Sequence, residues 1–181
     1  MVRGRTGLAT AAAALAALAV LAAALSGCGP SASTVKANAQ QARKALDDIV
    51  YYDVELLLVP TVVMRTTEPT AVATARQAAD MKAWLGRDLA VIESRSKALA
   101  AMAHSPGLGD SKTDELLVST SAWLEESYLP AIRAAVSGVA PGRTLGEVEA
   151  KLGAPWSGTL GEAAKGRIAT LRAALAKKAG G

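Results

Sequence analysis

Residues 78–102, AADMKAWLGRDLAVIESRSKALAAM, decide the fold class of this chain. Apolar side chains recur there at steps of three and four residues, which is the spacing of one face of an α-helix. They are Ala78, Met81, Leu85, Leu89, Ile92, Leu99 and Met102. With Thr66-Thr67-Glu68-Pro69 as its cap and first turn, the pattern predicts one helix of about 34 residues, or about 50 Å.

Two further segments have the same period. Over residues 34–59 the apolar positions are Ala42, Leu46, Ile49, Val50, Val54, Leu57 and Leu58. Pro60 is expected to end that helix, because proline lacks the N–H that continues it. After a break at residues 104–110, a third helix is predicted, capped within Ser111-Lys112-Thr113-Asp114 and kinked between Glu126 and Pro130. Its core positions are Leu117, Thr120, Leu124, Tyr128, Ile132, Ala135 and Val136.

The last forty residues contain a short repeat. Thr144-Leu145-Gly146-Glu147 recurs as Thr159-Leu160-Gly161-Glu162, and both have the hydroxyl and glutamate spacing of a capping box. We expect two helix starts, the first opening a short helix that ends at Gly153 and Pro155. The second helix carries Ala164, Ile168, Leu171 and Leu175. The predicted fold class is therefore all-α, an antiparallel bundle of about four main helices over residues 35–181.

Composition supports a helical core in a single domain. The chain has no phenylalanine, three tryptophans and three tyrosines, so its core must be built from Leu, Ala, Val, Ile and Met. Without residues 1–27 the chain has 154 residues, enough for one domain. That part carries 16 acidic and 18 basic side chains, so its charge balance does not indicate a nucleic-acid partner.

The N-terminus has the three parts of a secretory signal peptide. Arg3 and Arg5 make a basic start, residues 8–25 are apolar apart from Thr10, and small residues follow. A transmembrane helix is the rival interpretation, because 18 residues span about 27 Å. The abundance of alanine and the absence of a basic cluster after the run favour export.

Leu25-Ser26-Gly27-Cys28 follows this apolar run and contains the only cysteine of the chain. The four residues resemble the lipobox of a bacterial lipoprotein precursor. The resemblance covers residues 1–28 and implies cleavage before Cys28. It also implies a thioether-linked diacylglycerol on Cys28, usually with an amide-linked fatty acid such as palmitate. Residues 28–34 would form the lipidated cysteine and tether, and the domain would be anchored on the extracytoplasmic side of the bacterial cell envelope.

Few residues suggest chemistry. His104 is the only histidine, and with Ser105 and Asp110 it forms a possible hydrolase triad, against the plainer interpretation of an exposed loop histidine. The sequence has neither a cysteine metal cluster nor a glycine-rich phosphate loop. We therefore assign no catalytic residue and expect no metal and no cofactor.

Asp53, Glu55 and Tyr128 are the candidate polar pocket. Asp53 flanks the apolar stripe of the first helix, and a carboxylate buried there needs a partner such as an arginine of the second helix. Structural ion pairing and a ligand pocket both fit this pattern, and the first is favoured. Trp84 and Trp123 are expected at the edge of the core. The ring of Trp156 either closes the bundle or is presented to a partner.

The expected function follows from the anchor and from the lack of a catalytic pattern. We expect a non-enzymatic, membrane-anchored binding or envelope-interaction module whose partner is an unidentified envelope protein. The alternative is a small-ligand-binding bundle with an internal cavity near Asp53, Glu55 and Tyr128. A hydrolase that uses the His104 loop is the least favoured interpretation.

Overall fold

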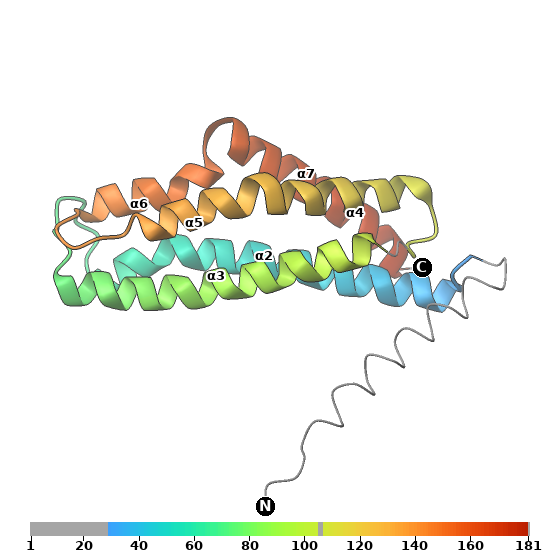
Figure 1. Cartoon of the computed structure of the whole chain (residues 1–181), viewed down its shortest axis with the longest axis horizontal. Coiled ribbons are helices and arrows are strands. Elements are labelled where there is room, and N and C mark those ends of the chain that lie inside the picture. The colour runs from blue at the N-terminus through green and yellow to red at the C-terminus, as the bar shows by residue number, and fades with distance from the viewer. Residues whose placement is uncertain (1–28, 105–106, 181) are drawn as a thin grey trace, which may run out of the picture.

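The computed structural model describes residues 29–104 and 107–180. The predicted signal peptide, the lipobox and Cys28 lie outside these residues, as does Ser105. The described chain is an all-α antiparallel bundle of four rods, as predicted (Figure 1). The first two rods are α2 (Ala32–Met64) and α3 (Ala75–Ala103). The third joins α4 (Ser111–Trp123), the π-helical turn η1 (Leu124–Tyr128) and α5 (Leu129–Ser137), and the fourth joins α6 (Leu145–Gly153), the 3₁₀ turn η2 (Ala154–Trp156) and α7 (Gly158–Gly180).

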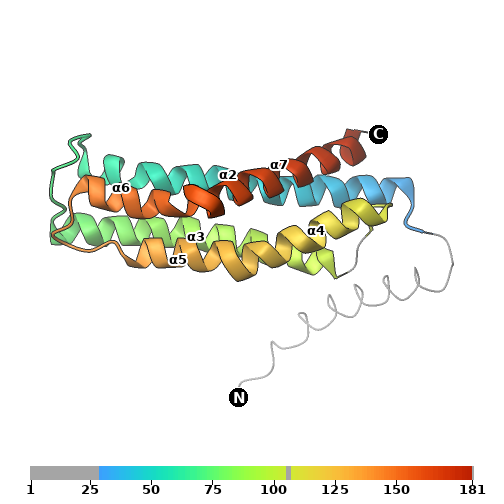
Figure 2. The ribbon, with the colours of Figure 1, turned by 90° about the horizontal axis from the view of Figure 1, so that it is seen from above.

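The core runs along the axis between the four rods, which lie side by side in both perpendicular views (Figures 1 and 2). The apolar positions predicted for the third and fourth rods are buried, and so are most of those predicted for α3. The largest fully buried side chains include Tyr128, Ile49, Met81, Leu85, Ile92, Leu117 and Leu171. Aliphatic packing against few aromatic rings is thus how this chain builds its core, as composition indicated.

The helix α2 is longer than predicted at both ends. It begins at Ala32, inside the expected tether, because the Ser31 side chain accepts a hydrogen bond from the backbone N–H of Thr34 at 3.2 Å. It continues past Pro60 to Met64, so the prediction that Pro60 ends the helix was wrong. A proline inside a helix costs about 3 kcal/mol. Pro60 and Met64 are both buried, and burial of apolar surface acts against that cost.

The predicted core face of α2 was also wrong beyond Ile49. Val54 and Leu58 were assigned to the core, but 53% and 56% of their surface is exposed. The buried positions after Ile49 are instead Asp53, Leu56, Val59, Pro60 and Met64. The core face continues from Ile49 by a step of four to Asp53, and this turns Val54 and Leu58 outward.

The helix α3 starts later than predicted. Thr74 is its N-cap and forms a capping box with Gln77, so α3 has 29 residues rather than about 34. The segment from Thr66 to Pro69, expected as its cap, is a loop. Backbone groups of this α2–α3 loop instead bond the loop between α5 and α6. The N–H of Ala73 donates to the oxygen of Arg143 at 2.8 Å, and the N–H of Leu145 donates to that of Ala71 at 2.8 Å.

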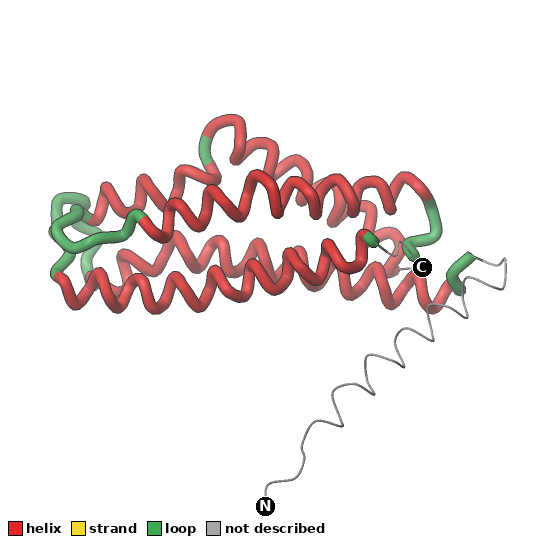
Figure 3. The backbone as a smooth tube through the Cα atoms, in the orientation of Figure 1, coloured by secondary structure: helices red, strands yellow, loops and turns green. Residues whose placement is uncertain are grey.

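The third rod deviates where a kink was predicted. Residues 124–128 form a π-helical turn just before Pro130. The rod remains helical through this turn (Figure 3). A π turn contains an extra residue, so the consecutive side chains of Tyr128 and Leu129 are both buried. The cap of this rod is Asp110, whose side chain accepts from the N–H of Thr113 at 2.9 Å, one residue before the predicted segment.

The two halves of the C-terminal repeat behave differently. Thr144 and Glu147 form the predicted capping box of α6. The prediction for the second half was wrong, because α7 begins at Gly158 and Thr159 lies inside its first turn. None of the helices described between residues 29 and 180 is both long and apolar enough to cross a membrane.

Candidate functional site

Asp53 and Tyr128 meet in the centre of the bundle. The Tyr128 hydroxyl donates a hydrogen bond of 2.7 Å to Oδ2 of Asp53, and both residues are buried. Oδ1 of Asp53 is buried without a hydrogen-bond partner among the described residues. The predicted carboxylate is therefore buried as expected, but its partner is a tyrosine of η1 rather than an arginine of α3. The pair fixes α2 against the third rod.

Three aromatic rings gather on the Tyr128 side of this pair. The ring of Trp123 stacks on Tyr128 with centroids 5.2 Å apart, and Trp156 meets Tyr128 edge-on at 5.3 Å. The guanidinium of Arg167 lies 5.9 Å from the Trp123 ring centroid, within cation–π range. Trp156 therefore closes the flank of the bundle at the junction of α6 and α7. Trp84 and Trp123 are partly buried against the core, as predicted.

Burial controls the protonation of this pair. Loss of solvation raises the pKa of Asp53 to about 7, although the hydrogen bond from Tyr128 acts in the opposite direction. Burial, and then the charge of Asp53, raises the pKa of the Tyr128 hydroxyl, so tyrosine keeps its proton. Near neutral pH the site therefore holds a carboxyl group that is partly protonated.

Glu55 does not join Asp53 and Tyr128. Its carboxylate lies on the outer side of α2, where it accepts a hydrogen bond of 2.6 Å from the Tyr51 hydroxyl. Sequence reasoning missed Asp88 of α3, which is buried with Oδ2 unpartnered in the described structure. Burial and the charge of Glu55 raise the pKa of Asp88. The apolar residues on either side of Asp88 gave only a weak indication of its burial.

The described hollows lie away from this pair. One of about 450 Å³ is lined by Gln40, Arg43, Lys44, Asp47, Asp48, Ala176, Ala179 and Gly180. A second, of about 580 Å³, lies over Ser111, Asp114, Glu115, Val118 and Ser119. Neither contains Asp53, Glu55 or Tyr128, so these hollows do not supply the cavity expected for the ligand-binding alternative.

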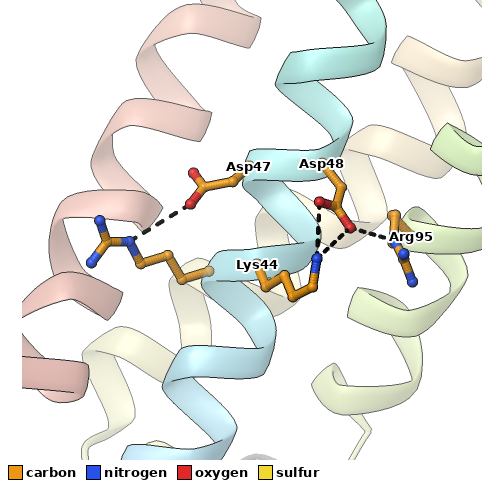
Figure 4. A network of polar contacts seen from close by, with 5 residues as sticks. Lys44, Asp47, Asp48 and Arg95 are labelled. Carbon is orange, nitrogen blue, oxygen red and sulfur yellow. Dashed lines mark hydrogen bonds and ion pairs between the residues drawn. The ribbon is translucent and has the colours of Figure 1, made fainter.

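Arginine pairing does occur one and a half turns before Asp53. Arg95 of α3 lies 2.7 Å from Asp48, which also binds Lys44 at 3.3 Å (Figure 4). Arg172 of α7 lies 2.5 Å from Asp47. These partly exposed pairs link α2 to both neighbouring helices. Such pairs contribute about 0–1 kcal/mol each, so they align the helices more than they stabilise them.

The His104 loop does not assemble a triad among the residues described. His104 is exposed at the end of α3. The Asp110 carboxylate caps α4 and lies 2.7 Å from Nζ of Lys178. The hydrogen bond from Lys178, followed by those from Thr113, lowers the pKa of Asp110 to about 2. The Asp110 carboxylate is thus occupied by contacts that join α4 to α7.

The outer face of α2 carries the exposed apolar residues of this helix. Tyr51, Val54, Leu58 and Val62 are each 53–58% exposed. At about 100° per residue they fall within an arc of about 80° and extend over about 16 Å. We call these four residues the α2 stripe. Val54 and Leu58 of the stripe were predicted in the core, and the sequence gives no sign that Tyr51 and Val62 are exposed.

No protein-family model matches this chain, and comparison with curated proteins and with solved structures gives no significant match. Within residues 29–104 and 107–180, no group of three or more His, Cys, Asp or Glu side chains is arranged to hold a metal ion.

Proposed function

We propose that this protein is a lipid-anchored, extracytoplasmic interaction module of the bacterial cell envelope. The observation that carries the interaction is the α2 stripe. It collects four large exposed apolar side chains on one helix face. Water-exposed apolar residues are ordinary when scattered, but a contiguous group on one face is typical of a surface that binds a partner.

Support for the anchor comes from the N-terminal residues. The resemblance of Leu25-Ser26-Gly27-Cys28 to a lipobox implies acylation of Cys28. The helix α2 begins at Ala32, so only a few residues would separate the lipid from the folded domain. An anchor of two or more acyl chains holds a protein stably at a bilayer, at roughly 0.8 kcal/mol per buried methylene.

The anchor is tested by the intact mass of the protein in membrane fractions, with wild type beside Cys28→Ser. We expect a species that begins at residue 28 and carries acyl mass, and we expect Cys28→Ser to lose it. An uncleaved chain of unmodified mass in both samples would exclude the anchor.

The interaction is tested separately with a photo-crosslinking amino acid at Leu58 in cells. The matched control carries it at Val118, which is exposed on α4 away from the stripe. We expect a discrete crosslinked species from position 58 and none of the same mass from position 118. Equal background from both positions would reject the stripe as a binding surface.

A further inference from the structure

The α2 stripe has charged residues with complementary positions at its two ends. Glu55 lies beside its first residue, Tyr51, and Arg65 follows its last residue, Val62. The only hydrogen bond to Glu55 within the described residues comes from the Tyr51 hydroxyl. Arg65 is exposed at the C-terminal cap of α2, and none of the ion pairs within residues 29–104 and 107–180 includes it.

We infer that the partner of the α2 stripe is a second copy of this chain, bound through an antiparallel α2–α2 contact about a two-fold axis at Leu58. The inference rests on the proposed function, because it names the partner of the α2 stripe, the surface on which that function depends. A two-fold contact uses the same surface on both copies, so that surface must be complementary to itself.

The register follows from the positions of these residues. With Leu58 on the axis, residues whose numbers are equally far from 58 face each other. Val54 then packs against Val62 of the second copy, and Leu58 against its equivalent. Arg65 of the second copy comes to the Tyr51 ring and its bonded Glu55 carboxylate. Glu55 of each copy is thus placed to pair with Arg65 of the other copy.

The opposite orientation is unfavourable. In a parallel contact Glu55 would face Glu55 of the second copy, and Arg65 would face Arg65. Like charges placed opposite each other at an interface disfavour that arrangement. Charge therefore selects the antiparallel arrangement, and the apolar residues between the charges supply the attraction.

The expected contact is weak. Four side chains that are each about half exposed present roughly 300–400 Å² per copy, which is below the area of a stable dimer interface. Anchoring of both copies to one membrane would raise their effective concentration and favour pairing. We therefore expect a reversible dimer of the full chain in membranes.

Disulfide crosslinking tests the register. Leu58→Cys should crosslink to itself under mild oxidation, because its two copies lie beside the axis. Val62→Cys should not crosslink to itself, because its two copies are eight residues, or about 12 Å, apart along the helices. Val54→Cys and Val62→Cys should crosslink to each other when coexpressed. Wild type, whose only cysteine is Cys28, controls for disulfides at that position.

A charge substitution tests the affinity. Leu58→Lys places two ammonium groups at the axis and should lower at least tenfold the yield of the Val54→Cys to Val62→Cys crosslinked dimer of the full chain in membranes. Val118→Lys, an equivalent change at an exposed valine of α4, should leave it unchanged. Both sites are exposed, so the helical circular dichroism of both variants should match wild type.

Three results would overturn the inference. Self-crosslinking of Val62→Cys as well as of Leu58→Cys would indicate a parallel contact, because equivalent residues then face each other along the whole stripe. A monomeric full chain whose position 58 is shielded from a water-soluble maleimide only by membranes would indicate a lipid surface. Capture of a different protein at Leu58 by a monomeric chain would retain the proposed function but exclude a second copy as its partner. The mass and membrane fractionation of the same samples show separately whether the lipid anchor is present, so failure of the anchor is distinguished from failure of the dimer.

Discussion

The Tyr128 hydroxyl donates a 2.7 Å hydrogen bond to the buried carboxylate of Asp53, 75 positions earlier in the chain. The bond joins the first rod to the π-helical turn of the third. It provides the acid with one partner and leaves its other oxygen unpartnered in the described structure. The pair therefore specifies how the rods align. Because one carboxylate oxygen has no partner in the described structure, part of the free-energy cost of burying the acid is not compensated.

We predict that Asp53 makes the folded state less stable as pH rises. Its pKa is about 7 in the folded state against an ordinary value of 3.8, so the folded state holds the proton longer than the unfolded chain. The stabilisation is complete below about pH 4 and is lost as pH rises through 7, about 2–3 kcal/mol of it between pH 5 and pH 8. The raised pKa of Asp88 acts in the same direction.

Asp53→Asn checks this, because it keeps an acceptor for Tyr128 and removes the charge. Denaturant unfolding at pH 5 and pH 8 should show a flatter profile for the variant and greater stability than wild type at pH 8. A wild-type profile that rises between these values would contradict the buried acid.

We predict that Tyr128→Phe destabilises the protein by about 1–3 kcal/mol, because Asp53 loses its hydrogen bond and remains buried. Since that bond lowers the pKa of Asp53, the variant should also titrate Asp53 at a higher pH than wild type. Carboxyl-carbon NMR measures the titration, and denaturant unfolding measures the stability. Tyr52→Phe is the control, because Tyr52 is only partly buried. An equal loss of stability in Tyr128→Phe and Tyr52→Phe would show that the Tyr128 hydroxyl has no special role.

We predict opposite effects for two glycines of α7. A Cβ atom at Gly161 would collide with the backbone of Trp156, whereas one at Gly166 meets open space. Gly166→Ala should stabilise the helix by about 0.5–1 kcal/mol, and Gly161→Ala should destabilise the protein despite the same gain in helix propensity. Thermal unfolding of the two variants is the measurement. A Gly161→Ala protein as stable as Gly166→Ala would show that the α6–α7 junction relaxes freely.

We predict that Asp110→Ala lowers stability more than Asp110→Asn. Asparagine retains the cap of α4 and loses only the charge toward Lys178, whereas alanine loses both. The pKa of Asp110 is lowered to about 2, so its contribution is present above about pH 4 and is lost as pH falls from 4 to 2. Unfolding midpoints at pH 7 and pH 2.5 test this. Identical midpoints for the two variants at pH 7 would exclude a capping role.

Local patterns predicted the helical class, the antiparallel bundle and most of the core. The first capping box of the repeat, Thr144 with Glu147, was also predicted correctly, because it depends on neighbours in sequence. At the predicted kink before Pro130 the structure has a π-helical turn. The site was predicted in part. Asp53 and Tyr128 belong together, but Glu55 does not.

The remaining errors come from interactions between distant residues. From Val54 to Val63 nearly every residue of α2 is apolar, so periodicity alone does not select the buried face. Asp53 takes a core position because Tyr128 supplies its partner from another rod. Similarly, the late start of α3 reflects hydrogen bonds to a loop some seventy residues onward, such as that between Ala73 and Arg143.

The two ends of the bundle are closed in different ways. At the end where α2 finishes, backbone hydrogen bonds and a β-bridge between Val72 and Thr144 hold the two loops together. The start of α2 and the end of α7 lie together at the other end (Figure 1). The contacts there include side-chain ones such as that of Asp110 with Lys178. Because residues 29 and 180 lie there, a circular permutant that links residue 180 to residue 29 and opens between α3 and α4 would preserve every rod. A cut in either backbone-bonded loop would instead divide one helical hairpin, α2–α3 or the third and fourth rods, at the place where the two hairpins are hydrogen-bonded to each other.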